Sequence, residues 1–92
     1  MAQTIWKTIL KSIDEQVIEV PGGAEMLHVR DQHSVIAIWY RCDPAEEKKP
    51  RKILICGTGH AAPTDAASLY IGTVSLQGGT LILHVFERTA NE

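Results

Sequence analysis

The segment Cys56–Pro63 holds the residues best suited to contact a ligand. Gly57-Thr58-Gly59-His60 follows an apolar run and combines two glycines with a hydroxyl and an imidazole. Glycines let backbone amides approach a ligand closely, and a glycine-rich backbone can form a nest of N–H groups that binds an anion. The spacing matches neither a phosphate-binding loop nor a dinucleotide-binding fingerprint, because no helical pattern follows it. Two interpretations stay open: a ligand-binding loop, and a wide turn that needs positive φ at two positions.

A second set of candidates comes from the final predicted hairpin. Gly-Gly is a favoured two-residue turn, so Gly78-Gly79 predicts that Leu76 faces Leu81 and that Tyr70 faces Glu87. Alternation along the strands then collects one mixed polar and apolar face, whose members are Ile71, Thr73, Ser75, Ile82, His84 and Phe86. We expect this face to contact a subunit partner or a ligand, with Thr73, His84 and Phe86 as its site residues.

The opposite face of the same hairpin is predicted to be core. Its members are Tyr70, Val74, Leu76, Leu81, Leu83 and Val85. Trp39 and Tyr40 point to opposite faces of another strand, and we expect Trp39 to pack in the core. Trp6 lies on a predicted edge strand, where an indole can anchor a partner, and it completes the set of candidate binding residues.

The sequence offers little support for metal or nucleophilic chemistry. Of the four histidines, His28, His33, His60 and His84, only His28 and His33 are closely spaced, and no Cys-x-x-Cys is present to complete a zinc site with them. No Gly-x-Ser-x-Gly elbow occurs. Cys42 and Cys56 end apolar runs, where cysteine acts as a small hydrophobic residue, although the two could also pair. We therefore expect no metal, no cofactor and no enzymatic activity.

Strands dominate the pattern that must position these residues. Apolar runs and turn residues predict seven strands, over Thr4–Leu10, Gln16–Val20, Met26–Arg30, Ser34–Cys42, Lys52–Cys56, Ser68–Leu76 and Leu81–Glu87. Pro21-Gly22-Gly23 ends the second strand, and Asp31-Gln32-His33 is the expected turn of a hairpin. Asp43–Arg51 is expected to be a loop, and Thr64–Ser68 is the best place for a helical turn. The fold class is all-β, an antiparallel meander that forms a small barrel or sandwich in a single domain, residues 1–92.

Charge and length limit the partners. Nine basic and eleven acidic residues are spread over 92 positions, so the clustered cations of a duplex-binding protein are missing. The mixed-charge run Glu46–Lys52 is expected to be a solvated loop. The N-terminus does not resemble a signal peptide, and Val35–Tyr40 is far shorter than the ~20 apolar residues that span a membrane. We expect a cytoplasmic protein that forms a homo-oligomer, because apolar residues occupy both faces of its strands.

Five segments of the sequence resemble a family of small phage and prophage proteins of unassigned function. The segments are Ile5-Trp6-Lys7, Gln16–Ala24, Gly57-Thr58-Gly59-His60, Tyr70-Ile71-Gly72-Thr73 and His84-Val85-Phe86-Glu87. The similarity covers nearly the whole chain, but it supplies no catalytic or binding residue. It implies a viral origin and a host cytoplasm.

Three hypotheses about function follow from these observations. The first is a non-enzymatic phage accessory protein, an oligomer that binds and sequesters a nucleotide-like defence signal of the host. The second is a protein–protein inhibitor of a host defence complex, which would dock through the same exposed face. The third is a minor virion or assembly component. A retained small-molecule mass in a native mass spectrum would favour the first of these over the second.

Overall fold

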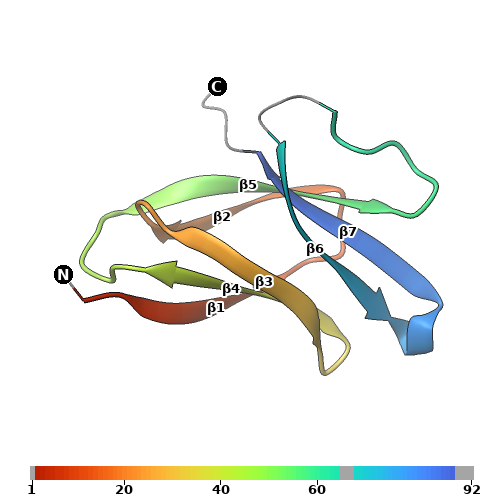
Figure 1. Cartoon of the computed structure of the whole chain (residues 1–92), viewed down its shortest axis with the longest axis horizontal. Coiled ribbons are helices and arrows are strands. Elements are labelled where there is room, and N and C mark those ends of the chain that lie inside the picture. The colour runs from red at the N-terminus through yellow and green to blue at the C-terminus, as the bar shows by residue number, and fades with distance from the viewer. Residues whose placement is uncertain (1, 65–67, 89–92) are drawn as a thin grey trace.

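The computed structural model describes residues 2–64 and 68–88 as a β-sandwich (Figure 1). Its strands are β1 (Thr4–Leu10), β2 (Glu15–Pro21), β3 (Glu25–Gln32), β4 (Val35–Cys42), β5 (Lys48–Gly57), β6 (Ser68–Leu76) and β7 (Leu81–Arg88). One 3-10 turn, η1 (Gln77–Gly79), joins the last two strands. The all-β class, the seven strands and the sandwich alternative are confirmed.

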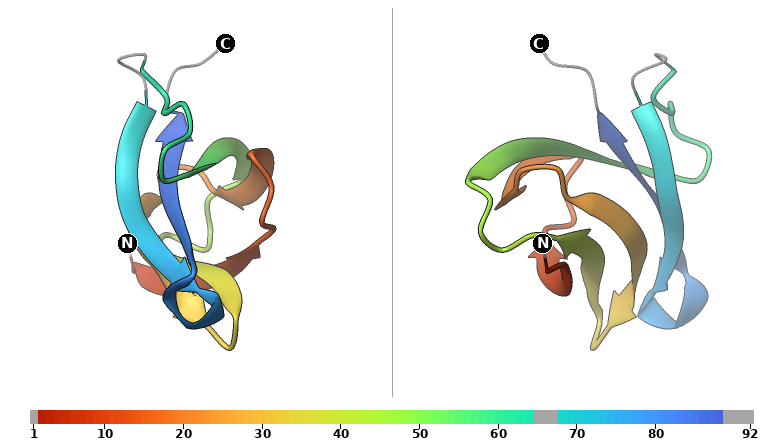
Figure 2. Two further views of the ribbon diagram at one scale, coloured as in Figure 1. Left: turned by 90° about the vertical axis from the view of Figure 1, so that its right-hand side faces the viewer. Right: turned by 60° about the vertical axis from the view of Figure 1, so that its left-hand side comes forward.

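The strands form two antiparallel sheets that pack face to face. The small sheet has the order β1-β4-β3, and the large sheet has the order β2-β5-β7-β6. Figure 2 shows the two layers. No strand pairing joins the two sheets among the described strands, so they do not close into a barrel. Sequence neighbours pair only in β3–β4 and β6–β7 among the described strands. The strand order is therefore more complex than the expected meander, since β1 pairs with β4 and β2 pairs with β5.

The core lies between the sheets and is built by alternate residues of each strand. In β4 the inward side chains are Ile36, Ile38, Tyr40 and Cys42, and all of them are buried. The large sheet faces them with Val20, Ile53, Ile55, Val74, Leu76 and Val85. Such alternation stabilises the fold because each strand removes one apolar face from water. The prediction for Trp39 was wrong: Tyr40 takes the core position, and Trp39 is half-buried on the outer face.

Two β-bulges bring the sheets together along one side of the sandwich. The β3–β4 register shifts between Met26 and His28, and the β6–β7 register shifts between Tyr70 and Gly72. A bulge bends its strand and increases the local twist, so β3 and β6 cross at close range. A Cβ on Gly72 would lie 2.8 Å from Val29 Cγ2, and glycine leaves the room for this crossing.

The turns depart from the expected positions in two places. The β3–β4 hairpin turns at His33 and Ser34, both at positive φ, instead of at Asp31-Gln32-His33. Asp31 Oδ1 accepts the Ser34 amide at 2.9 Å, which supports this left-handed pair of residues. The final hairpin turns around Gly78 and Gly79 as expected, closed by the Thr80 amide on the Gln77 carbonyl.

The expected loop Asp43–Arg51 is also partly strand. β5 begins at Lys48 and contains Pro50, which pairs with Glu19 of β2. Proline is tolerated there because β7 begins to pair with β5 only at Lys52, so the missing N–H falls where β5 has one neighbour. Residues 46–49 are exposed, as a solvated segment requires, whereas Asp43 is buried and Arg51 is only partly exposed.

The helical turn predicted over Thr64–Ser68 rests on residues 65–67, which lie outside the described residues, and Ser68 already belongs to β6. Within the described ranges, no helix has the length and apolar character needed to cross a membrane.

Candidate functional site

The connection from β5 to β6 passes over the outer face of the large sheet. β7 lies between these strands and is antiparallel to both, so β5 and β6 run in the same direction. The chain must therefore return along the length of the sheet, and the small sheet already fills the inner face. We call its described part, residues 58–64, the strap. Leu54 is only 9% exposed although it points outward, because the strap covers it.

A tight turn begins the strap. The His60 amide donates to the Gly57 carbonyl at 3.1 Å, and Gly59 has φ +89°. Positive φ is needed once and not twice, which corrects the wide-turn alternative. The His60 amide is engaged in this turn, so a nest of free amides over the whole Gly57–His60 segment is also excluded. What the turn presents to a ligand is the His60 side chain, which is exposed.

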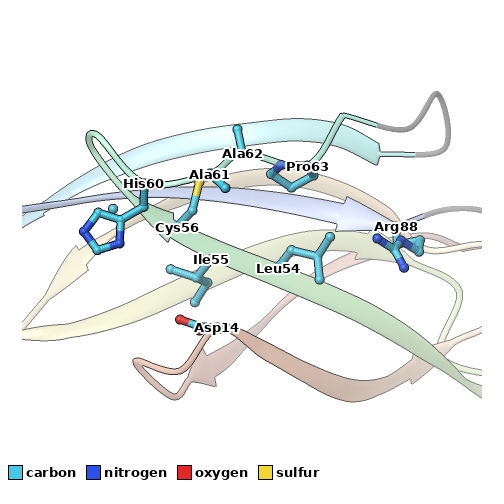
Figure 3. Close-up of a pocket in the computed structure, with 10 residues that line it drawn as sticks. Asp14, Leu54, Ile55, Cys56, His60, Ala61, Ala62, Pro63 and Arg88 are labelled. Atoms are coloured by element: carbon cyan, nitrogen blue, oxygen red, sulfur yellow. The ribbon is translucent and has the colours of Figure 1, made fainter.

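A pocket of about 410 Å³ lies where the strap crosses β5 (Figure 3). Its lining comprises Asp14, Leu54, Ile55, Cys56, Gly57, His60, Ala61, Ala62, Pro63 and Arg88. Figure 3 shows Cys56 pointing toward Ala61, whereas Ile55 and Asp14 lie on the other side of the β5 ribbon. His60 and Arg88 mark opposite ends of the lining in this view. An apolar centre with an imidazole at one end and a guanidinium at the other suits a ligand that carries a charged group.

A row of hydrogen bonds joins the strap to the outer face of β6 and β7. Thr58 Oγ1 lies 2.8 Å from His84 Nε2, and Thr73 Oγ1 lies 2.9 Å from His84 Nδ1. The Tyr70 hydroxyl continues the row by hydrogen bonding to Thr73 Oγ1. A neutral imidazole has one donor and one acceptor nitrogen, so the two threonines take opposite roles toward His84. The row holds the start of the strap against the sheet.

The structure brings most of the predicted site residues together. Gly57 and His60 line the pocket, while Thr58, Thr73 and His84 form the adjacent row. The two parts are neighbours because Cys56 of the pocket is the ladder partner of His84. Phe86 packs edge-on against Tyr70, with ring centroids 5.5 Å apart, at the end of the row. Trp6 lies on β1 in the other sheet and does not belong to this site.

Like Trp39, Tyr70 and Ile71 were placed on the wrong face by sequence reasoning. Tyr70 was expected in the core, but it is 59% exposed. The bulge at Ile71 shifts its ladder partner from the expected Glu87 to Phe86, which rotates Tyr70 outward and Ile71 toward the core. Glycine at position 72 inside a strand pattern was the available signal for a bulge.

Residues 1–92 match the family described as "Domain of unknown function (DUF7352)". The chain belongs to this family. No curated protein and no solved structure matches it. For this DUF7352 domain, the roles of individual residues must therefore be argued from its own geometry.

Charges around the DUF7352 site are arranged near the Arg88 end. Lys52 Nζ lies 2.7 Å from Glu15 Oε2, and this ammonium lowers the pKa of the Glu15 carboxyl by hydrogen bonding and by its charge. On the other side of the fold, burial and the Asp43 carboxylate raise the pKa of the Cys42 thiol. Cys42 and Cys56 are both free thiols, so they do not pair. Among the described residues, no cluster of histidine, cysteine or acidic side chains could hold a metal ion.

Proposed function

We propose that this chain is a non-enzymatic binding protein that holds a small, nucleotide-like anion between the strap and β5. The observation that supports this most is the 410 Å³ pocket with Arg88 at one end and His60 at the other. Its volume falls within the roughly 300–1,000 Å³ that is usual for small-molecule sites.

The residues on the strap side of β5 each suit one part of such a ligand, and the Asp14 carboxylate lies on the other side of the β5 ribbon. Leu54 and the half-buried Cys56 offer an apolar floor for a flat ring system. The Arg88 guanidinium can donate paired hydrogen bonds to a phosphate, which a point charge such as an ammonium cannot do. Ala61 and Ala62 have short side chains, so a ligand can approach the backbone of the strap.

The hydrogen-bonded row supports the same function by holding the strap in place. A binding site gains affinity when its wall is already positioned before the ligand arrives. Thr58 is at the start of the strap and is fixed to His84, while Gly59 and the residues after it complete the wall. Thr73 and Tyr70 thus act on the ligand through His84 and Thr58, as positioning residues.

The biological setting that we propose is a phage accessory protein in the host cytoplasm. The similarity to small phage and prophage proteins motivates this setting, and a domain with a ligand pocket could sequester a nucleotide signal of the host's immune response. Such a protein needs no catalytic residue, because removing the free signal is sufficient.

Calorimetry with His60→Ala tests the pocket. Native mass spectrometry of the protein purified from host cells first identifies a retained mass, and a panel of linear and cyclic nucleotides serves as the probe. His60→Ala should weaken binding about 10–100-fold, the equivalent of one hydrogen bond to a charged group, and leave thermal stability unchanged. His33→Ala is the matched control, since His33 is also an exposed histidine at a turn. Equal affinity of His60→Ala and the parent protein would exclude the pocket as the site.

The alternative function is a protein–protein inhibitor, and one surface favours it. The outer face of the small sheet carries Lys7, Arg30 and Arg41 around Trp39, with Glu25 paired to Arg41. In a chain of net charge −2, this local excess of cations suits an acidic protein partner. Capture of a host defence protein that Trp39→Ala abolishes and His60→Ala leaves intact would support this alternative.

A further inference from the structure

The β1 strand is the one sheet edge that nothing in the described fold protects. β3 and β6 carry bulges and pack against each other, which closes one side of the sandwich. β2 carries two glutamates and ends in Pro21. β1 pairs with β4 along its whole length without a bulge, and its other side faces no strand of the described chain (Figure 1). An exposed, regular and apolar edge is a template for pairing with another strand.

Several side chains of β1 are both apolar and exposed, as is typical of a contact surface. Ile5 and Ile9 on the outer face are 58% and 49% exposed, and Trp6 on the inner face is 38% exposed. The one charged residue of the strand, Lys7, is turned away from the edge. Its Nζ lies 2.6 Å from Gln32 Oε1 and 5.9 Å from the centre of the Trp39 ring, across its own sheet. The Lys7 ammonium group, whose charge would oppose strand pairing, therefore lies away from the edge of β1.

We infer that β1 pairs with β1 of a second copy of this chain, antiparallel and about a two-fold axis through Lys7. The two small sheets then form one continuous six-stranded sheet. Lys7 is the midpoint of the seven-residue strand, so this register is the one that pairs all of β1, from Thr4 to Leu10. Residues that face each other in an antiparallel ladder lie on the same face of the sheet, and a two-fold axis repeats each pair twice.

The register matches apolar with apolar side chains. Ile5 lies opposite Ile9 of the second copy, and Ile9 lies opposite its Ile5, so two aliphatic pairs form on the outer face. On the inner face Trp6 lies opposite Thr8. A shift of the axis to Trp6 or Thr8 would instead place Lys7 opposite Ile5 or Ile9 and would leave strand ends unpaired. Cross-strand apolar pairs stabilise a ladder, whereas like charges directly opposite each other oppose it. In the proposed register the two Lys7 residues face each other across the axis, and each ammonium group is directed across its own sheet to Gln32 and Trp39, away from the other.

A second copy of this chain fits the β1 edge better than an acidic protein partner does. The cations of the small sheet lie on its outer face, toward β3, whereas the edge itself presents isoleucine and the backbone of β1. The inference is independent of the ligand pocket, because β1 and the strap belong to different sheets. Loss of dimerisation and loss of ligand binding are therefore separable outcomes.

Matched lysine substitutions test the interface. Ile5→Lys should raise the dimer dissociation constant about 50-fold, since each dimer loses two apolar pairs and gains two ammonium groups at the junction. Val17→Lys on β2 is the control, because Val17 is 56% exposed and lies on the outer face of the large sheet. Sedimentation velocity over a dilution series measures both. A parent protein that is monomeric at micromolar concentration would overturn the inference, and so would equal weakening by the two variants.

Cysteine cross-linking tests the register. Residues on the two-fold axis face each other with Cα atoms about 5 Å apart, within disulfide range, so Lys7→Cys should give a covalent dimer that reductant removes. Ile5→Cys should not, because two copies of Ile5 would be about 14 Å apart, four residues along the ladder. The parent protein, which keeps Cys42 and Cys56, controls for background oxidation. Cross-linking by Ile5→Cys and not by Lys7→Cys would refute this register.

Discussion

Gly72→Ala should destabilise the protein through a single contact between the two sheets. Gly72 does not have a positive φ, so the backbone itself accepts alanine. The new methyl group would lie 2.8 Å from Val29 Cγ2, closer than carbon atoms pack. Val29 lies on β3, where it is buried against Gly72 of β6, and it has little room to move away. We therefore expect a loss of about 1–3 kcal/mol, the usual cost of overpacking a core.

Val29→Ala is the second single variant of a double-mutant cycle with Gly72→Ala. On its own it removes two buried methyl carbons, which costs about 2 kcal/mol once a term for the residual cavity is included. In the double variant, the methyl group at position 72 occupies part of the space that Val29 has vacated. The two losses should therefore not add, and the coupling energy should be about 1–2 kcal/mol in the favourable direction.

Urea unfolding monitored by tryptophan fluorescence measures all four proteins of the cycle. The slope of the unfolding free energy against urea concentration should be the same for all four proteins, since the surface that each exposes on unfolding is nearly the same. Gly22→Ala is a control, because its nearest contacts to a new Cβ are 3.4 Å away. That variant should be neutral or up to about 1 kcal/mol more stable, as the alanine restricts the unfolded chain. Additive losses in the double variant would show that β3 and β6 do not touch at this point.

Three shorter predictions concern the turn and the charges. Gly79→Val should cost about 1–3 kcal/mol, because Gly79 has φ +97°, and an unchanged thermal midpoint would show that the hairpin does not need this geometry. Arg51→Met should cost about 2–4 kcal/mol by leaving Glu87, which is 3% exposed, without the cation that pairs with it; urea unfolding should then show partial recovery on adding Glu87→Gln. Lys52 lowers the pKa of the Glu15 carboxyl, so Glu15 stabilises the fold above the usual carboxyl pKa and loses this effect as the pH falls through the lowered value. The Glu15→Gln variant should therefore be less stable than the parent protein at neutral pH and equally stable in strong acid. A difference in stability between the two proteins that persists at pH 2 would contradict this.

Much of the fold was predictable because strand signals in this sequence are local. Turn residues such as Gly78-Gly79 and β-branched residues such as Ile53 and Ile55 define strands without reference to the rest of the chain. The pairing of β1 with β4 and of β2 with β5 was not predictable in this way, since no local signal names a distant partner. Pro50 illustrates the limit, because its place in β5 depends on where β7 begins to pair.

The sequence predicted which residues belong to the candidate site better than it predicted how these residues are arranged. The Gly57–His60 loop, Thr73 and His84 were found from residue type and alternation, and the structure places them close together. The bulge at Ile71 reversed the side of Tyr70, which a strict alternation cannot anticipate. The strap over Leu54 follows from the parallel directions of β5 and β6, and therefore from the strand order of the whole sheet.

The interleaved strand order has a consequence for how the protein is made. β1 must wait for β4, and β2 must wait for β5, so neither sheet can begin from the N-terminal strands as they leave the ribosome. More than half of the chain is synthesised before β2 meets its partner, and β5 becomes a central strand only after β7 arrives. Pairings between such distant segments fold slowly, on a timescale of milliseconds to seconds. During synthesis the apolar β1 therefore stays unpaired for longer than any other strand of its sheet, and this interval is when chaperones can bind it.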